Sequence, residues 1–333
     1  MTTGAPTIDF VITWVDGSDE NWLRERARFL PDQGVQNMSA LYRDWGILKY
    51  WFRAVEQFAP WVNQIHFVTW GHLPSWLRTD HPKLHIVRHQ DYIPAEYLPT
   101  FSSHPIELNL HRIPGLSEQF VYFNDDMVLT APIQPDDFFL DGLPRDSFVM
   151  SALTPSLVND PFVHYLCNDM AVINTHFRKK AVLKKQFSKI FSLKYGKLLF
   201  KNLYYSGVGN FTGFHNFHMP AAYLKRTFEA VWEQEPEILA QTSSHRFRER
   251  TDVNPYVFTY WQLCSGDFVP RKPTMGKMYT IGENEALYGA VADHLYRMLC
   301  INDTIREIDF EAEKQKLTDC FERAYPNPSS FEK

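Results

Sequence analysis

The amino-acid sequence predicts an α/β fold with an open, mostly parallel β-sheet, and two observations support the prediction. Apolar runs rich in β-branched and aromatic residues, typical of buried strands, alternate with segments of helical spacing. Two of these runs end directly in polar turns, at 16–19 and 124–126, that contain aspartates. In an open α/β sheet the ligand crevice lies outside the carboxyl ends of the strands. We therefore expect both acidic turns at one ligand-binding edge.

Each element follows from its local pattern. Strands are expected at 8–15, 65–70, 84–87 and 120–123, where the residues are mainly apolar, β-branched or aromatic. Apolar residues at helical spacing predict one helix at 41–58, closed by Pro60. A second helix is expected at 104–113, because Ser102 and Ser103 precede it, Pro105 lies in its first turn and Pro114 follows it.

Composition restricts the class of protein. With 333 residues, the chain is expected to form one enlarged domain or a core with a subdomain. A net charge of -5 argues against a nucleic-acid partner. The four cysteines form no zinc or disulfide pattern, and neither a signal peptide nor a membrane span is recognisable. We expect a cytoplasmic protein, with contact at the inner face of a membrane left open.

A basic segment interrupts this acidic chain. No aspartate or glutamate occurs from 170 to 228, whereas lysines alternate with apolar residues through 178–201. This amphipathic pattern suits either a solvated helical face or contact with an anionic membrane or a polyprenyl-linked acceptor. We expect an α/β core at 1–150, a basic, mainly helical insertion at 151–210, the rest of the core at 211–325 and a loose tail at 326–333.

The turn Asn124-Asp125-Asp126 is the first candidate for chemistry. Adjacent carboxylates at a sheet edge can hold Mg²⁺ or Mn²⁺ through oxygen ligands while the cation bridges diphosphate oxygens. The alternative is an ordinary solvated turn. Asp16 and Asp19, in the other turn, are candidates to complete such a site or to contact a nucleotide.

Histidines and arginines give three further candidate groups. His104, Glu107 and His111 have the spacing of one helix face, as in some metal sites, but their order is not the HExxH of zinc peptidases. We therefore expect hydrogen bonding to a substrate or to the acidic cluster rather than zinc binding, with core capping by His104 and His111 as the alternative. His218-Met219-Pro220 and Arg246-Phe247-Arg248 supply groups that phosphoryl transfer uses for proton movement and charge stabilisation. An arginine-rich turn is also common on solvated surfaces.

Taken together, these segments resemble the Stealth family, which includes bacterial capsular polysaccharide phosphotransferases and the catalytic subunit of the lysosomal-enzyme GlcNAc-1-phosphotransferase. The resemblance covers most of the chain. It is carried by Ile8–Asp19, by the long stretch from Tyr42-Arg43 through Leu98–His104 and His111–Glu118 to Phe123–Asp126, by His218-Met219-Pro220, by Arg246–Arg248 with Asp252, and by Cys300-Ile301-Asn302-Asp303. It implies a Rossmann-like, glycosyltransferase-A-like core.

The resemblance also implies a function. A carbohydrate hydroxyl would attack the β-phosphorus of a UDP-hexose, forming a phosphodiester and releasing UMP, with a metal at Asp125 and Asp126. The implied catalytic residues are Glu107, Asp126, His218 and Arg248. The implied substrate-binding residues are Trp14, Asp16, Gly17, Arg43, His104, His111, Arg112 and Asp252. The main rival is a metal-dependent glycosyltransferase that releases UDP, and the second is a carbohydrate-binding protein without turnover.

Overall fold

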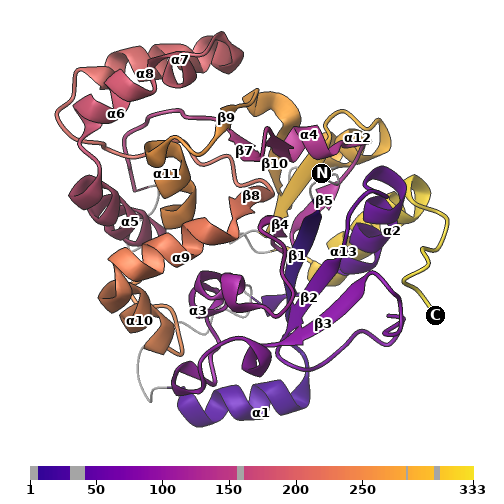
Figure 1. Ribbon diagram of the computed structural model, residues 1–333. Helices are drawn as coiled ribbons and strands as arrows, with labels where there is room; N and C mark the ends of the chain where they lie inside the picture. Colours follow the sequence, from indigo (N-terminus) through magenta and orange to yellow (C-terminus); the bar gives the residue numbers. More distant parts are fainter. Residues whose placement is uncertain (1–6, 31–41, 156–160, 283, 304–307) are drawn as a thin grey trace, which may run out of the picture.

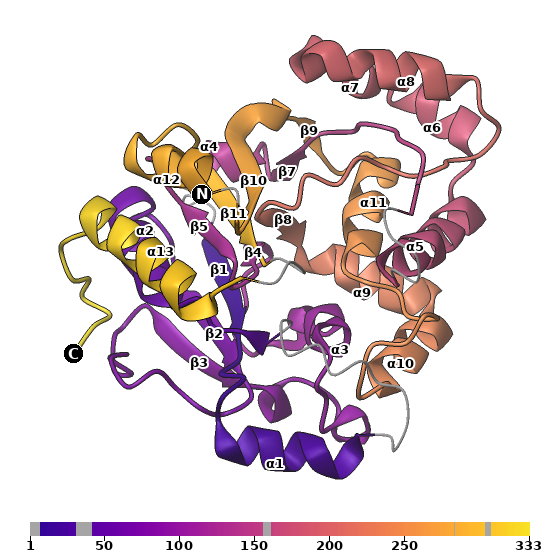
Figure 2. The same ribbon diagram turned by 180° about the vertical axis from the view of Figure 1, so that it is seen from behind.

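A five-stranded sheet forms the centre of the computed structural model, which describes residues 7–30, 42–155, 161–282, 284–303 and 308–333 (Figures 1 and 2). The strands are β1 (Ile8–Trp14), β2 (Ile65–Thr69), β3 (Leu84–Arg88), β4 (Gln119–Phe123) and β8 (Ala221–Leu224). Their order is β3-β2-β1-β4-β8; the first four run parallel, and β8 is antiparallel to β4. The predicted α/β fold with a mostly parallel sheet is confirmed.

Both faces of the sheet are covered by apolar side chains, which explains why β1 reads as a continuous apolar run. Phe10 and Ile12 of β1 point to one face and pack with residues of α2 (Leu48–Phe58) and α13 (Phe310–Ala324). Val11 points to the other face and belongs to the core formed with α9 (Lys225–Gln234) and α11 (Tyr256–Ser265). Successive residues of a strand alternate between faces, so one strand serves both cores.

Two small three-stranded sheets extend the core and help to position the site. One contains β10 (Gly276–Thr280), β11 (Met298–Asn302) and β5 (Met127–Leu129), with β5 antiparallel to β11. The other contains β6 (Phe139–Leu140), β7 (Leu143–Asp146) and β9 (Val269–Pro270). Because β5 follows β4 after a short turn, that turn lies between the central sheet and β11.

The helices between 179 and 206 lie at one end of the molecule, away from the central sheet, and the helix before them, at 162–176, packs against α11 (Figures 1 and 2). They are α5 (Phe162–His176), α6 (Lys179–Lys185), α7 (Phe187–Ile190) and α8 (Leu199–Ser206). A separate apolar cluster that includes Met170, Tyr195 and Phe268 holds them. The remaining α-helices of the described residues are α1 (Glu20–Phe29), α3 (Ser103–Leu108), α4 (Pro135–Phe138), α10 (Pro236–Ser244) and α12 (Asn284–Ala292). Of the helices described, none is sufficiently long and apolar to cross a membrane.

Two predicted helices are shorter than the sequence pattern indicates. The helix predicted at 41–58 begins only at Leu48; Leu41 lies outside the described residues, and Gly46 has a φ of 73° and donates its backbone N–H to Asp44. The helix predicted at 104–113 ends at Leu108. There the side chain of Asn109 donates to the Pro105 carbonyl oxygen, and a 3₁₀ turn follows at Leu110–Arg112.

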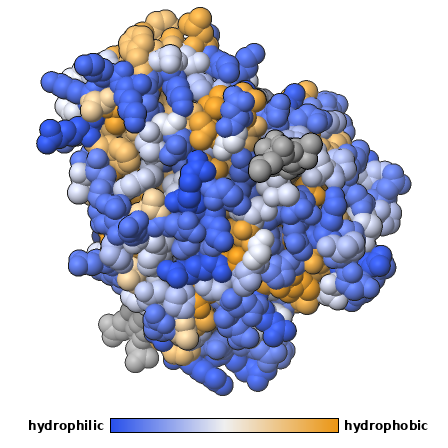
Figure 3. Space-filling view, viewed as in Figure 1, coloured by the Kyte–Doolittle hydropathy of each residue, from blue (hydrophilic) through white to orange (hydrophobic). Residues whose placement is uncertain are grey.

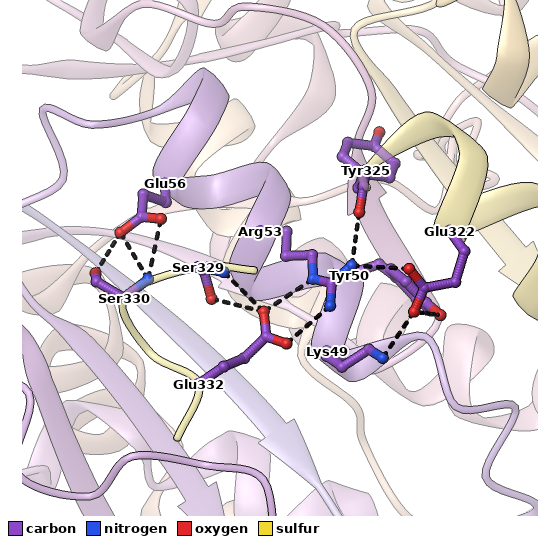
Figure 4. Close-up of polar contacts among 9 residues, drawn as sticks. All are labelled: Lys49, Tyr50, Arg53, Glu56, Glu322, Tyr325, Ser329, Ser330 and Glu332. Atoms are coloured by element: carbon purple, nitrogen blue, oxygen red, sulfur yellow. Dashed lines mark hydrogen bonds and ion pairs between the residues drawn. The ribbon is translucent and has the colours of Figure 1, made fainter. Parts of the chain in front are cut away.

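The segment 326–333, predicted as a loose tail, is packed against the core, so that prediction is wrong. Phe331 is buried. Glu332 accepts two hydrogen bonds from the guanidinium of Arg53, at 2.8 and 2.9 Å (Figure 4). Arg53 also donates to Glu322 and to the carbonyl oxygen of Tyr325, which ties α2 to the end of α13. Apolar burial and a buried ion pair together order these residues.

Candidate functional site

The candidate site lies at the edge of the sheet where β1 and β4 end. The two strands are parallel neighbours, with Ile12 opposite Phe123, so the turns that follow them leave the sheet at the same edge. β8 is antiparallel to β4, with Ala221 opposite Tyr122, so its first residues are also at this edge. The sheet order therefore brings 16–19, 124–126 and 218–220 together from three distant parts of the sequence.

Asp126, His218 and Cys300 form the centre of this edge. His218 Nε2 lies 3.5 Å from Asp126 Oδ2, and its Nδ1 lies 3.2 Å from the Tyr256 hydroxyl. The Cys300 thiol donates to Asp126 Oδ2 at 3.2 Å, because the pairing of β11 with β5 places Cys300 opposite Met127. Burial alone would lower the pKa of His218, but the Asp126 carboxylate raises it above the ordinary histidine value.

The backbone of His218 is strained. Its φ is 48°, in the left-handed region that residues with a Cβ rarely occupy. Such a conformation persists only where the surrounding structure holds it, and it is common at functional sites. The conformation is consistent with a side chain held for chemistry rather than for packing.

Glu107 is a buried carboxyl group that faces this edge from α3. It accepts a hydrogen bond from the Tyr122 hydroxyl at 3.0 Å, and that hydroxyl also contacts Thr13 of β1. Burial raises the pKa of Glu107 to about 7, although the nearby Arg248 charge opposes the shift. A carboxyl group with this pKa can change its protonation state near neutral pH, as a proton relay requires.

Arg248 reaches the site from the loop after α10. It donates to Ser103 Oγ at 2.9 Å. The loop is held by the buried carboxylate of Asp252, which contacts His104 Nδ1 at 3.0 Å and His245 Nδ1 at 2.6 Å. Asp252 and His104 are thus placed to fix the guanidinium of Arg248 relative to α3 and do not line the cavity themselves.

Two cavities adjoin the site, one lined by Asp125, the neighbour of Asp126, and the other by His218. The first, of about 170 Å³, is lined by the ends of β1 and β4, by aromatic side chains and by Glu107, Asp125 and Arg248. The second, of about 60 Å³, is lined by 214–221 and by Tyr256, Met275 and Met298. Asn124 and Asp125 line the first cavity and His218 lines the second, so the contact of Asp126 with His218 connects the linings of the two cavities. The aromatic residues of the first cavity are Trp14, Trp22, Tyr42 and Phe101.

The turn at 124–126 has the donor atoms that a divalent cation needs. Asn124 Oδ1 and Asp126 Oδ1 are buried and have no hydrogen-bond partner among the described residues. Buried oxygens of this kind are costly unless a donor or a cation satisfies them, and Mg²⁺ and Mn²⁺ prefer oxygen ligands. Enclosure of the site, with the charges of Asp126 and Asp44, raises the pKa of Asp125, which a cation would offset.

A second donor set shares Asp126. Asp126, His218 and Cys300 each offer one ligand atom, and these atoms lie within 4.8 Å of one another. Oxygen, nitrogen and sulfur ligands together are more typical of zinc than of magnesium. Both sets contain Asp126, which is therefore the residue that the two donor sets share. Asp125, predicted as its companion ligand, faces the first cavity.

The structure brings most, but not all, of the predicted site residues together. Trp14, Glu107, Asp125 and Arg248 line the first cavity, and Asp126 contacts His218. Asp16 and Gly17 form the adjoining turn, where the Asp16 backbone N–H donates to His72 Nε2. Arg43 lines neither cavity; it lies 3.6 Å from Asp303 and over the Phe310 ring.

His111 and Arg112 were predicted to bind substrate, but the structure does not bring them to either cavity. His111 lies beyond the end of α3, so the prediction that it shares a helix face with His104 and Glu107 is wrong. It packs against Phe228 and Trp232, and Arg112 lies over the Trp232 ring. Burial lowers the pKa of His111 to about 3, as expected for a core histidine.

Sequence reasoning missed four residues that complete the site. Tyr122 holds Glu107, Tyr256 contacts His218, and His245 shares Asp252 with His104. Tyr122 lies inside a predicted strand, where an aromatic residue signals only burial. Cys300 belongs to the segment Cys300–Asp303, which carries part of the family resemblance, yet its contact with Asp126 depends on a strand pairing that no local pattern predicts.

These observations define the class of protein: an α/β protein whose carboxyl sheet edge carries the buried acid Glu107, the half-buried pair of Asp126 and His218, and the exposed Arg248 beside two cavities. Residues 6–34, 41–145 and 290–333 match models of Stealth conserved regions 1, 2 and 4. A capsular polysaccharide phosphotransferase, WcwK, of Streptococcus pneumoniae is 41% identical over 98% of each chain. The chain belongs to the Stealth family.

Other relatives have the same extent. An exopolysaccharide phosphotransferase, cps2G, of Lactiplantibacillus plantarum is 41% identical over all of this chain and 98% of its own. A receptor polysaccharide phosphotransferase, WefC, of Streptococcus gordonii is 41% identical over 98% of both chains. Among solved structures, the galactosyltransferase LgtC covers 94% of this chain and 95% of its own at 12% identity, with a TM-score of 0.41.

Proposed function

We propose that this protein is a polysaccharide phosphotransferase that moves a hexose 1-phosphate, for example GlcNAc 1-phosphate, from a UDP-sugar to a carbohydrate hydroxyl. The reaction forms a phosphodiester, releases UMP and serves capsular or exopolysaccharide synthesis in the cytoplasm. The full-length relatives named as polysaccharide phosphotransferases support the class of reaction. The observation that carries the proposal is the contact between His218, which lines the second cavity, and Asp126, whose neighbour Asp125 lines the first.

The first cavity suits the UDP-sugar. Flat side chains such as Trp14 and Tyr42 can stack against a base or a sugar ring. Arg248 faces the same space, so its guanidinium would neutralise charge on the transferred phosphoryl group. Mg²⁺ or Mn²⁺, if bound at Asp125 and Asp126, would neutralise the negative charge of the diphosphate and of the departing UMP.

The second cavity suits the acceptor. His218 faces it beside Tyr256, so an acceptor hydroxyl placed there would give its proton to the imidazole as its oxygen attacks the β-phosphorus. The β-phosphorus bond to the UMP oxygen breaks in the same transfer. Asp126 would stabilise the imidazolium that forms. Glu107, held by Tyr122, would position the phosphoryl group or relay a proton.

The nucleotide product tests the proposal directly. Purified protein is incubated with a panel of UDP-sugars, Mg²⁺ or Mn²⁺ and a capsule-type oligosaccharide, and UMP is separated from UDP. We expect UMP, a new phosphodiester in the product, and loss of turnover in EDTA that Mg²⁺ or Mn²⁺ restores. UDP without a phosphodiester would establish the rival, a metal-dependent glycosyltransferase.

Two variants test the assignment of residues. Asp126→Ala and His218→Ala should each lower kcat by at least about a hundredfold, because each removes a group that acts on the transferred proton or phosphoryl group. His111→Gln is the control variant. His111 packs in the core and lines neither cavity, so this variant should turn over as the unaltered protein does. Normal turnover in a folded Asp126→Ala or His218→Ala protein would show that the assignment is wrong.

A further inference from the structure

An exposed apolar surface lies on the helices at the end of the molecule formed by 178–206. Among the described residues, the four most exposed large apolar side chains all come from this segment: Leu193 at 86%, Tyr204 at 75%, Phe200 at 73% and Phe187 at 64%. Leu203 is 52% exposed. Apolar atoms gather over α7 and α8 in the space-filling view (Figure 3). We call these five residues the apical patch.

The outward direction of the apical patch is fixed by buried groups beneath it. Phe200, Leu203 and Tyr204 are three and four residues apart on α8 and share one helix face. Asn202 is fully buried and donates to the carbonyl oxygens of Phe148 and Ile190. A helix anchored through this amide has to present the opposite face to its surroundings. The exposure is therefore built into the packing.

Basic residues precede and alternate with the residues of the apical patch along the chain, and the structure separates two kinds. Lys179 and Lys189 are structural, because their ammonium groups donate to backbone carbonyl oxygens such as those of Tyr205 and Gly266. Others are exposed and form no ion pair within the described part of the chain: Arg178, Lys180, Lys184, Lys185 and Lys197. With no aspartate or glutamate from 170 to 228, nothing in the segment itself neutralises these charges.

We propose that the apical patch docks on an anionic lipid surface, with its aromatic and leucine side chains in the interface and the exposed lysines on lipid phosphates. Apolar groups flanked by lysines are the composition of helices that lie in a membrane interface. Basic residues near an anionic leaflet each add favourable electrostatic energy. The surface has an unneutralised positive charge, which matches this partner. The inference does not depend on the chemistry proposed above.

Vesicle binding by the full chain tests the proposal. Sedimentation is compared between vesicles of equimolar phosphatidylglycerol and phosphatidylcholine and vesicles of phosphatidylcholine alone. We expect binding to the anionic vesicles only, weakened by salt. Phe200→Ser with Tyr204→Ser, and Lys184→Glu with Lys185→Glu, should each weaken binding by more than about tenfold.

Matched controls separate the patch from general effects. Leu295→Ser removes a side chain that is 61% exposed elsewhere, and Arg24→Glu with Arg28→Glu reverses two exposed charges on α1. Both should bind as the unaltered protein does, and thermal unfolding confirms that every variant is folded. Equal binding by patch and control variants, equal binding to both kinds of vesicle, or no binding at all would overturn the proposal. A concentration-dependent dimer abolished by Phe200→Ser, without vesicle binding, would instead assign the patch to self-association.

Discussion

At the scale of single residues, Glu107 links the stability of the protein to its chemistry. Its carboxyl group is buried, and its pKa is raised to about 7 from the ordinary 4.5. A raised folded-state pKa means that the group stabilises the fold fully below pH 4.5, and that this contribution is lost as pH rises to 7. The native state thus carries a destabilising charge at the pH where the site would operate.

Glu107→Gln should therefore stabilise the protein at pH 8 and inactivate it. The amide oxygen still accepts from Tyr122 but carries no charge, so the free energy of unfolding should exceed that of the unaltered protein by about 3 kcal/mol at pH 8. The difference should shrink as pH falls and vanish near pH 4.5. Urea denaturation at several pH values measures this difference, with the exposed Glu229→Gln as control. A pH-independent difference would contradict the assigned pKa.

Asp252 should affect catalysis indirectly, by holding the loop that carries Arg248. Its buried carboxylate holds His104 and His245 and also accepts the Glu249 backbone N–H. Asp252→Asn replaces one acceptor oxygen with a donor, so the 245–252 loop should shift Arg248 away from Ser103. We expect kcat to fall about tenfold or more and the KM for the donor to rise, because the Arg248 guanidinium would no longer be correctly placed. If Ser103→Ala and Asp252→Asn leave kinetics unchanged, Arg248 does not need this support.

At the scale of elements, the turn after β1 depends on a close backbone approach. A Cβ at Gly17 would lie 2.6 Å from the Tyr42 Cβ, and nearer still to the Tyr42 carbonyl oxygen. Tyr42 and Trp22 both line the first cavity, so any shift there changes the proposed donor site. Gly17→Ala should lower stability by about 2 kcal/mol and raise the donor KM. At Gly209 an added Cβ meets nothing within 4 Å, so Gly209→Ala should be neutral. Equal effects at both glycines would refute the steric account.

The elements also show what local sequence can and cannot predict. Strands such as β1 and β4 were recognisable because they are buried on both faces, and the polar turns that follow them sit where parallel strands end. The start of α2 was misplaced because the apolar spacing continues through residues that Asp44 and Gly46 hold in a turn. The end of α3 was missed because a side-chain bond from Asn109 stops it, whereas Pro114 is the more obvious signal.

At the scale of the whole molecule, the site depends on pairings between distant segments. His218 reaches Asp126 only because β8 returns antiparallel to β4, and Cys300 does so through β11. The residue types of the site were predictable from motifs, since acids after strands and histidines beside prolines are visible in one dimension. Their partners, Tyr122 and Tyr256, were not, because an aromatic residue in an apolar run looks the same whether its hydroxyl serves the core or the site.

The segment 326–333 packs against α2, and stability measurements can test what holds it there. Arg53 of α2 is buried and pairs with Glu332, whose side chain is 9% exposed, and also with the more exposed Glu322 of α13 (Figure 4). Removing one partner of a buried pair leaves an uncompensated charge, so Arg53→Met should lower the free energy of unfolding by about 3 to 5 kcal/mol. The exposed pair of Arg226 with Glu118 gives the control, because Arg226→Met should cost less than about 1 kcal/mol.

The pairing itself is tested by removing both charges. Arg53→Met combined with Glu332→Met should recover part of the loss, since apolar side chains can replace a buried ion pair with little cost when neither charge remains. Urea denaturation with a common slope for all variants gives the comparison. A loss from Arg53→Met no larger than the loss from Arg226→Met would show that Phe331 and backbone contacts, rather than the Arg53 guanidinium, hold the segment 326–333.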